Sequence, residues 1–217
     1  MKKFSNNSFA ALDVHGETSV IDVFSGVSGK KKILIWDNAH FTYLLLAKSS
    51  CLDLSIDVQG SNVKCQIFVL FVSDAHVALD AKVITHISGT SVKVQKHVLS
   101  LLWEQGHISA DAHIDIAPWI KAISAHLLEE NIVFGQHVSV KSLPALSVAS
   151  RDVHASHAAK IEKINHEKLF YMSSKWLSQE MSQRLVVDGY VNDVLSYFVS
   201  FDDQELSLVR EFVQFLV

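Results

Sequence analysis

Hydrophobic and polar residues alternate along most of the chain, with a period of two from about Thr18 to Ile164. In the stretch "CLDLSIDVQG", apolar residues at 52, 54, 56 and 58 alternate with two aspartates and a serine. This alternation is typical of a strand that is buried on one face. The stretches "SVKVQKHV", "HISADAHIDIA" and "HVSVKSLPALSVASRDVHASH" repeat it, whereas "KKKILIWD" and "VKCQIFVLFV" indicate strands that are more fully buried.

The connections between these strands favour a solenoid over a sandwich. The segment "WIKAISAHLLEEN" is the one helix-like interruption, and because Ala122, Ser124 and His126 alternate in it we predict mostly strand. Hairpin dipeptides are missing from this region, since the one Asp-Gly pair, Asp188-Gly189, lies in a helical pattern. No fixed repeat length is visible, but many strands with few hairpin signals predict a parallel β-helix from about residue 10 to 164.

The period changes after Ile164, which predicts a β-helix domain over 1–164 and a helical domain over 165–217. Asn165 and Ser178 are expected N-caps of two helices, and Asp202 or Asp203 is expected to cap a third. The second helix is predicted to pack through Met181, Leu185, Tyr190, Val191, Val194, Leu195 and Phe198. The third is predicted to pack through Leu206, Val209, Phe212, Val213 and Leu216. These apolar stripes either cover the solenoid or leave a patch for a partner.

Composition narrows the function classes. The 217 residues are 49% hydrophobic and 19% charged, enough for one domain with a real core. A net charge of −4 argues against a nucleic-acid partner. The longest apolar runs are too short to span a bilayer and no secretory signal is visible, so a cytoplasmic protein without membrane attachment is expected. No nucleophile elbow and no glycine-rich phosphate loop occur, so any ATP chemistry is expected from a partner.

Histidine is abundant, with twelve residues, and two cysteines, Cys51 and Cys65, cannot build a disulfide framework. His154 and His157 are three residues apart in a strand-like stretch, so they point to opposite faces and form a poor chelating pair. Stacked rungs could align His113, His126 and His137 in a ladder, although surface positions are the simpler expectation.

Three ordered segments resemble the SufB/SufD family of iron–sulfur cluster assembly proteins, and SufD most. They are "SAHLLEENIVFGQHVSVKSLP", "PALSVASRDVHASHAAKIEKI" and "EKLFYMSSKWLSQEMSQRLVVDGYVNDVL". The resemblance implies a mainly β fold, a right-handed parallel β-helix followed by a small C-terminal helical domain. This expectation agrees with the change of period near Ile164.

The resemblance also implies a function, that of a SufD-like, non-catalytic scaffold subunit of a cluster assembly complex. Such a chain is expected to pair through its β-helix with a SufB-like chain or with a second copy of itself. Its C-terminal helices would dock a SufC-type ATPase of the ABC class, through Asp188, Tyr190, Val191, Asn192 and Val194. Iron or an iron–sulfur cluster would lie at the junction with the partner, with His157 as a metal ligand, and none is expected in the isolated chain.

Several positions depart from the family pattern. Ala155 stands where the family often has cysteine, Ala158 replaces a glycine, and Lys175-Trp176 replaces Arg-Gly. No cysteine lies near His157 in the sequence, so a partner would have to supply any thiolate. Two alternatives stay open, a His-rich β-solenoid or cupin-like metal-dependent enzyme and a degenerate structural paralogue. The absence of a His-x-His motif counts against the cupin.

Overall fold

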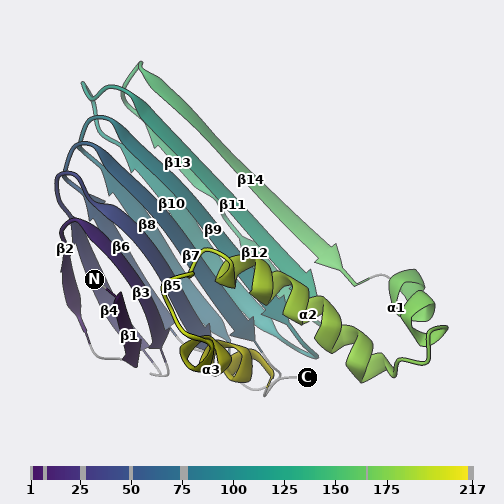
Figure 1. Cartoon of the computed structure of the whole chain (residues 1–217). Coiled ribbons are helices and arrows are strands. Elements are labelled where there is room, and N and C mark those ends of the chain that lie inside the picture. Colours follow the sequence, from purple (N-terminus) through teal and green to yellow (C-terminus); the bar gives the residue numbers. More distant parts are fainter. Residues whose placement is uncertain are drawn as a thin grey trace.

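The chain winds as a solenoid whose successive strands alternate between two parallel sheets (Figure 1). This computed structural model describes residues 2–6, 9–24, 28–48, 51–73, 78–164 and 166–214. Each turn of the solenoid, or rung, adds one strand to each sheet. Every strand pair is parallel and no hairpin joins neighbours within the described residues, which confirms the predicted parallel β-helix.

Almost every rung contributes one strand to sheet A and one to sheet B. Sheet A contains, in spatial order, β1 (Lys2–Asn6), β3 (Glu17–Phe24), β5 (His40–Lys48), β7 (Val63–Ser73), β9 (Val92–Leu102), β11 (Ile123–Val133) and β14 (Val153–Lys163). Sheet B contains β12 (Ser139–Ser142), β10 (His107–Ile116), β8 (Leu79–Ile87), β6 (Cys51–Val58), β4 (Ser28–Ile35) and β2 (Ala11–Val14), while β13 (Ala145–Val148) also pairs with β10. The strand β1 precedes the start that the pattern predicts.

The space between the sheets is the main hydrophobic core. Strand alternation turns every second side chain inward, and the parallel register stacks equivalent residues of successive rungs. Leu54, Val83 and Ala112 form one such row across β6, β8 and β10, and all three are buried. The segment predicted as mostly strand is β11, which confirms that prediction.

Turns of successive rungs stack closely at one corner of the solenoid. Asn38, Asn62, Ser91 and Ala122 have left-handed backbone angles of 56–58° and lie 24, 29 and 31 residues apart. The Asn62 amide donates a hydrogen bond to the Asn38 side-chain oxygen at 2.8 Å, so the first two turns are also linked through side chains. The unequal spacing explains why the sequence shows no fixed repeat.

Three helices follow the last strand: α1 (His166–Ser173), α2 (Gln179–Leu195) and α3 (Asp203–Gln214). Ser178 caps α2 by accepting a hydrogen bond from the Met181 amide at 3.1 Å, as predicted. Asp202 caps α3 in a capping box, since its carboxylate and that of Glu205 each accept the other residue's backbone amide at 2.9 and 3.1 Å. The predicted cap Asn165 and the core position Leu216 lie outside the described residues.

The helices α2 and α3 pack on the outer face of sheet A, over the C-terminal halves of its strands (Figure 1). Val187, Val191 and Val194 of α2 share a second hydrophobic cluster with outward-facing side chains such as Leu44 and Leu70. Among the described residues, none of the helices combines the length and hydrophobicity that crossing a membrane requires.

One part of the predicted packing face of α2 is wrong. Met181 and Leu185 are 53% and 50% exposed, whereas Val191, Val194, Leu195 and Phe198 are buried as predicted. The first turns of α2 lie beside α1, away from the strands, so only the C-terminal half of the helix has a sheet beneath it (Figure 1).

The stacked turns make a test of the solenoid. A Cβ on Gly89 would lie 1.7 Å from the Gly60 carbonyl oxygen, so Gly89→Ala should force two backbones apart. We expect a loss of about 2 kcal/mol or more in the free energy of unfolding, measured by urea denaturation.

Gly189→Ala is the matched control, because nothing lies within 4 Å of its added Cβ in α2. That change should raise stability by up to about 1 kcal/mol through helix propensity. Equal effects of the two substitutions would contradict the stacked arrangement.

Candidate functional site

The last rung of the solenoid leaves an open end. β14 is the edge strand of sheet A, and its inward face begins with Val153 and Ala155, which pack on the core. His157 continues that same face, in register with the buried Leu127 of β11. No described strand follows β14 in sheet A, so the inward side chains beyond Ala155 are exposed, and Ile161 is 61% accessible. His157 therefore stands at the rim of the solenoid interior.

The geometry around His157 leaves one ring nitrogen available. Pro144 separates β12 from β13, and its carbonyl oxygen lies 3.2 Å from Nδ1 of His157. A hydrogen bond to a carbonyl requires the proton on Nδ1, which leaves the Nε2 lone pair free to bind a cation. His154 lies on the opposite face of the strand, in register with Ser124, and is exposed.

A hollow of about 490 Å³ opens beside the end of β14. Its walls combine the apolar Val133, Val138, Val140 and Ile161 with Gly135, Gln136, His137 and Lys163. It adjoins the interior between sheet A and β12. The last rung thus combines an edge strand, a hollow and an accessible imidazole.

Beneath this rung the interior turns polar. Lys96 of β9 is buried and points inward, in the same cross-strand row as Leu127 and His157. Its ammonium crosses to sheet B and donates hydrogen bonds to the Val83 and His113 carbonyl oxygens at 2.5 and 3.0 Å. Burial lowers the pKa of Lys96 to about 7, although Glu129 and Asp111 oppose that shift.

Glu129 and Asn131 of β11 and Ser100 of β9 are inward-facing and fully or almost fully buried. Their side-chain oxygen and nitrogen atoms form no hydrogen bond within the described structure, and neither does the hydroxyl of Ser142. Burial raises the pKa of Glu129, while the positive charge of nearby Lys96 opposes that shift. Unpartnered buried polar atoms are rare in folded proteins, so this cluster marks the last rungs as chemically distinct from the apolar middle of the solenoid.

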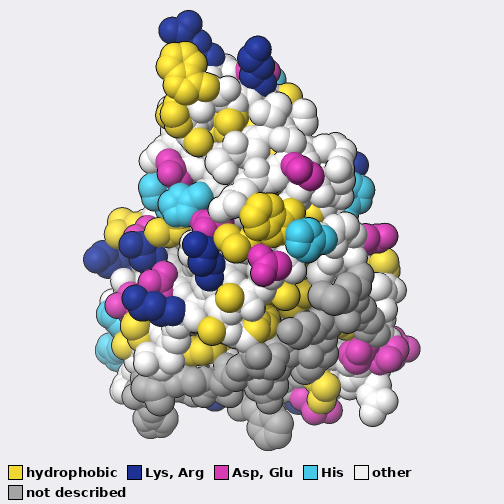
Figure 2. All heavy atoms as spheres, turned by 90° about the vertical axis from the view of Figure 1, so that its left-hand side faces the viewer, with side chains coloured by type: hydrophobic (Ala, Val, Ile, Leu, Met, Phe, Trp, Pro, Cys, Tyr) yellow, Lys and Arg dark blue, Asp and Glu magenta, His cyan; other side chains and the backbone are white. Residues whose placement is uncertain are grey.

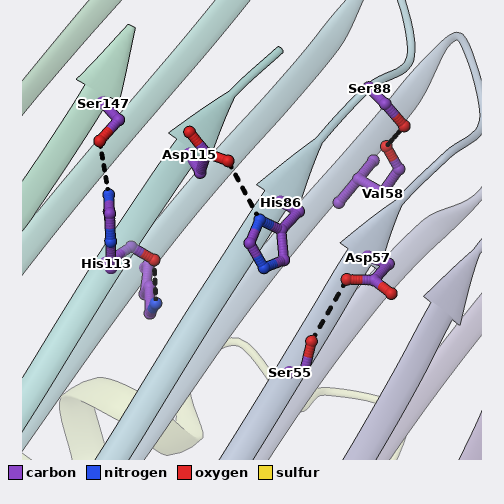
Figure 3. Close-up of polar contacts among 9 residues, drawn as sticks. Ser55, Asp57, Val58, His86, Ser88, His113, Asp115 and Ser147 are labelled. Atoms are coloured by element: carbon purple, nitrogen blue, oxygen red, sulfur yellow. Dashed lines mark hydrogen bonds and ion pairs between the residues drawn. The ribbon is translucent and has the colours of Figure 1, made fainter.

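Other histidines serve cross-strand contacts on the outer faces. On sheet B, His86 Nδ1 lies 3.2 Å from the Asp115 carboxylate and His113 Nε2 lies 2.8 Å from the Ser147 hydroxyl (Figure 3). His126 contacts Ser156 on sheet A and His137 lies in a turn, so the residues considered for a histidine ladder do not align. Seen from the side on which β2 lies, charged, histidine and hydrophobic side chains are interspersed (Figure 2).

No group of three histidine, cysteine, aspartate or glutamate side chains comes together within the described residues to hold a metal ion. Cys51 is exposed on β6 and Cys65 is buried on β7, which β9 and β11 separate from β14 in sheet A. Burial raises the pKa of the Cys65 thiol, so it stays protonated and is a poor ligand. Among the described residues, His157 therefore has no group of protein ligands around it that could hold a metal ion.

The residues predicted to dock a partner are divided between core and surface. Val191 and Val194 are buried against sheet A, and Tyr190 is half-buried beside them. Asn192 is exposed and accepts a hydrogen bond from Arg210 of α3, and Asp188 is half-buried. The large apolar side chains that α1, α2 and the turn between them expose are Phe170, Tyr171, Trp176, Met181 and Leu185, here called the α1–α2 patch.

The sequence of these strands and of the terminal rung matches one family of known proteins. The family model described as "SUF system FeS cluster assembly, SufBD core domain" covers residues 30–190. The chain belongs to the SufBD family. This confirms the resemblance and includes β14 with His157, α1 and most of α2.

Curated relatives agree with SufBD membership at low identity. The iron-sulfur cluster assembly protein SufD of Escherichia coli (strain K12) is 21% identical over 165 residues, which are 75% of this chain and 39% of that protein. A SufBD family protein of Pyrococcus horikoshii is 28% identical over 110 residues, 49% of this chain and 23% of that protein. Protein ABCI7, chloroplastic, of Arabidopsis thaliana is 22% identical over 132 residues, 60% of this chain and 27% of that protein. This SufBD-family chain thus spans well under half the length of these relatives.

Sequence reasoning missed the interior polar cluster, although the signal was present. In "SVKVQKHV", Lys96 lies an even number of residues from Val92 and Val94, on the same face of the strand. In "SAHLLEEN", Glu129 and Asn131 lie in the same way on the face of the buried Leu127. A charged residue at an inward position of an alternating strand is the warning sign.

The Lys96 amine makes stability depend on pH. Its pKa falls from 10.5 to about 7 on folding, so between these values the unfolded chain binds the proton more tightly than the folded chain. Its contribution to the free energy of unfolding must therefore rise with pH in this window, by up to about 1.4 kcal/mol per pH unit. Lys96→Met should remove that rise in urea denaturation between pH 7 and 8.5.

Lys93→Met provides the control, because Lys93 is exposed on the opposite face of the same strand. It should keep the rise of the wild-type protein. If the free energy of unfolding rises equally with pH in the wild type and in Lys96→Met, the Lys96 amine does not cause the rise.

Proposed function

We propose that this chain is a SufD-like, non-catalytic scaffold subunit in iron–sulfur cluster assembly. The observation that carries the proposal is the open last rung, where His157 stands exposed on the inward face of an edge strand within the segment matched to the SufBD core. Several relatives carry the words iron-sulfur cluster assembly in their names. Iron and sulfide are the cargo of such a scaffold.

The open end suits pairing with a SufB-like chain, and a second copy of this chain is the alternative. β14 presents unpaired backbone groups along one edge, which favour strand addition. Leu143, Val148 and Ile161 expose apolar side chains on the same rung. A partner that covers this end would remove both from water and bring its own ligands to His157.

A cupin-like enzyme receives no support from the fold. Cupins are double-sheet jelly rolls of antiparallel strands, whereas every described strand pair here is parallel. The degenerate paralogue remains an outcome that the iron experiment below distinguishes.

The α1–α2 patch is the surface that we assign to a SufC-type ATPase. It comprises five large exposed apolar side chains of α1, the following turn and the first turns of α2, which lie away from the strands. The sequence contains no glycine-rich phosphate loop, so nucleotide hydrolysis is assigned to this partner. Val191 and Val194, which the resemblance suggests as contacts, are buried where α2 packs on sheet A, so we assign the docking surface to the exposed residues beside them.

His157→Ala should abolish iron retention in the assembled complex. The purified chain, co-expressed with its SufB-like and SufC-like partners, should lose at least about tenfold in bound iron per complex, measured anaerobically. Folding and assembly should stay intact, because the side chain is exposed and its hydrogen bond among the described residues is to the Pro144 carbonyl.

His154→Ala is the control, since His154 is exposed on the opposite face of the same strand and should leave bound iron unchanged. If both substitutions lower bound iron, or neither does, the assignment of His157 is wrong. A chain that captures no partner and no iron would be the degenerate paralogue.

Leu185→Glu should separate docking from folding. Leu185 is half exposed in the α1–α2 patch, so a charge there should weaken ATPase binding by about tenfold or more while the melting temperature stays unchanged. Surface plasmon resonance with the immobilised ATPase measures the first effect and differential scanning calorimetry the second.

Val191→Asp is the matched core change, because Val191 is 2% exposed. It should lower the melting temperature strongly by burying an unpaired carboxylate. Unchanged binding of Leu185→Glu would remove the patch as the docking surface.

A further inference from the structure

A row of basic side chains crosses the outer face of sheet A, in the half that the helices leave uncovered. His40 of β5 is in register with Lys64 of β7, and Lys64 is in register with Lys93 of β9. All three side chains are exposed and lie on the outward face of their strands. The parallel register therefore brings together basic residues that are 24 and 29 positions apart in the sequence.

The two lysines have no acidic partner. Among the described residues, neither Lys64 nor Lys93 forms an ion pair, and they stand directly opposite each other on neighbouring strands. On sheet B, by contrast, Lys30 contacts Asp53 at 3.8 Å and Lys32 contacts Asp57 at 2.9 Å. Like charges opposite each other in a sheet are destabilising, so the sheet A row gains from a bound anion.

The row lines a hollow of about 310 Å³. A second row beside it adds hydrogen-bonding groups from Thr42, Gln66 and Gln95, and the Gln66 amide donates to the Gln95 oxygen at 3.4 Å. Glu17 borders the hollow beyond His40 and closes the basic row at that end. The hollow thus holds basic groups along one side and neutral polar groups along the other.

The spacing of the row selects the shape of the ligand. Neighbouring strands are about 4.8 Å apart, so the row from His40 to Lys93 extends about 10 Å. A single tetrahedral anion can contact one neighbouring pair, whereas a chain of two or three linked phosphates can contact all three basic groups. Lysine ammonium groups bind phosphate as point charges and need no bidentate geometry.

We infer that the hollow formed by His40, Lys64 and Lys93 is a binding site for a linear polyphosphate, either free or as the phosphate chain of a nucleotide. The site is independent of the proposed assembly role, because it lies on the outer face of sheet A and uses neither the last rung nor the helices. The net charge of −4 gives no sign of this basic site, because its three residues are far apart in the sequence and come together only when the strands pair.

Isothermal titration calorimetry of the full chain at about 150 mM NaCl tests the site, since this salt screens weak surface attraction. Pyrophosphate and tripolyphosphate should bind at least about tenfold more tightly than orthophosphate or sulfate. ATP binding as tightly as tripolyphosphate would identify a nucleotide site, and tripolyphosphate binding without ATP binding would identify a free polyphosphate site.

Lys64→Gln and Lys93→Gln should each weaken tripolyphosphate binding by about tenfold. Each should leave the melting temperature unchanged or slightly raised, because the repulsion between the two lysines is removed. Lys82→Gln is the control, since Lys82 is exposed on the outer face of sheet B. The inference is overturned if tripolyphosphate shows no binding up to about 1 mM, if orthophosphate binds equally well, or if Lys82→Gln weakens binding as much.

Discussion

Parallel in-register pairing is the constraint on which the rest of this structure depends. It stacks each inward side chain on its equivalents in neighbouring rungs, so the buried Lys96 lies between the apolar Ile67 and Leu127 in one row. The same register places the left-handed residues of the turns above one another and brings the Gly89 and Gly60 backbones into contact. It also fixes where the chain can be chemically active, because a side chain becomes accessible from inside only where the rows end.

Charged groups inside the solenoid lie near its two ends. In the first rungs, Asp22 of sheet A and Lys31 of sheet B form a buried ion pair at 2.8 Å, and Tyr43 donates to the same carboxylate at 3.0 Å. In the last rungs, Lys96 reaches the carbonyl oxygens of sheet B, while Glu129 stays unpartnered. A paired charge that links both sheets fixes their relative position, whereas an unpartnered carboxylate lowers stability. The first end therefore pairs its buried charges, although one Asp22 oxygen accepts no hydrogen bond among the described residues, whereas at the last end neither Glu129 oxygen accepts one.

Much of this fold follows from the sequence because alternation is a local property. A period of two needs only a few residues to appear, which is why β6, β10 and the ambiguous β11 were predicted correctly. The caps Ser178 and Asp202 are equally local. The length of a rung cannot be seen in a short stretch of sequence, and because equivalent turn residues are 24, 29 and 31 positions apart, the sequence shows no fixed repeat. The exposure of Met181 and Leu185 depends on where the sheet ends beneath α2, which no pattern within the helix records. The accessibility of His157 likewise depends on the absence of a following strand, and its predicted role came from the family resemblance.

In a solenoid, the structure around each site depends only on the rungs beside it. Repeated rungs contact only their neighbours, so the geometry of the last rung is set by β10, β11 and the turns beside them. The matched SufBD core covers these elements, although the chain spans only 39% of the length of the SufD relative. The environment of His157 therefore does not depend on how many rungs precede it. The basic row on sheet A depends instead on β5, β7 and β9, so substitutions in one site should leave the other intact.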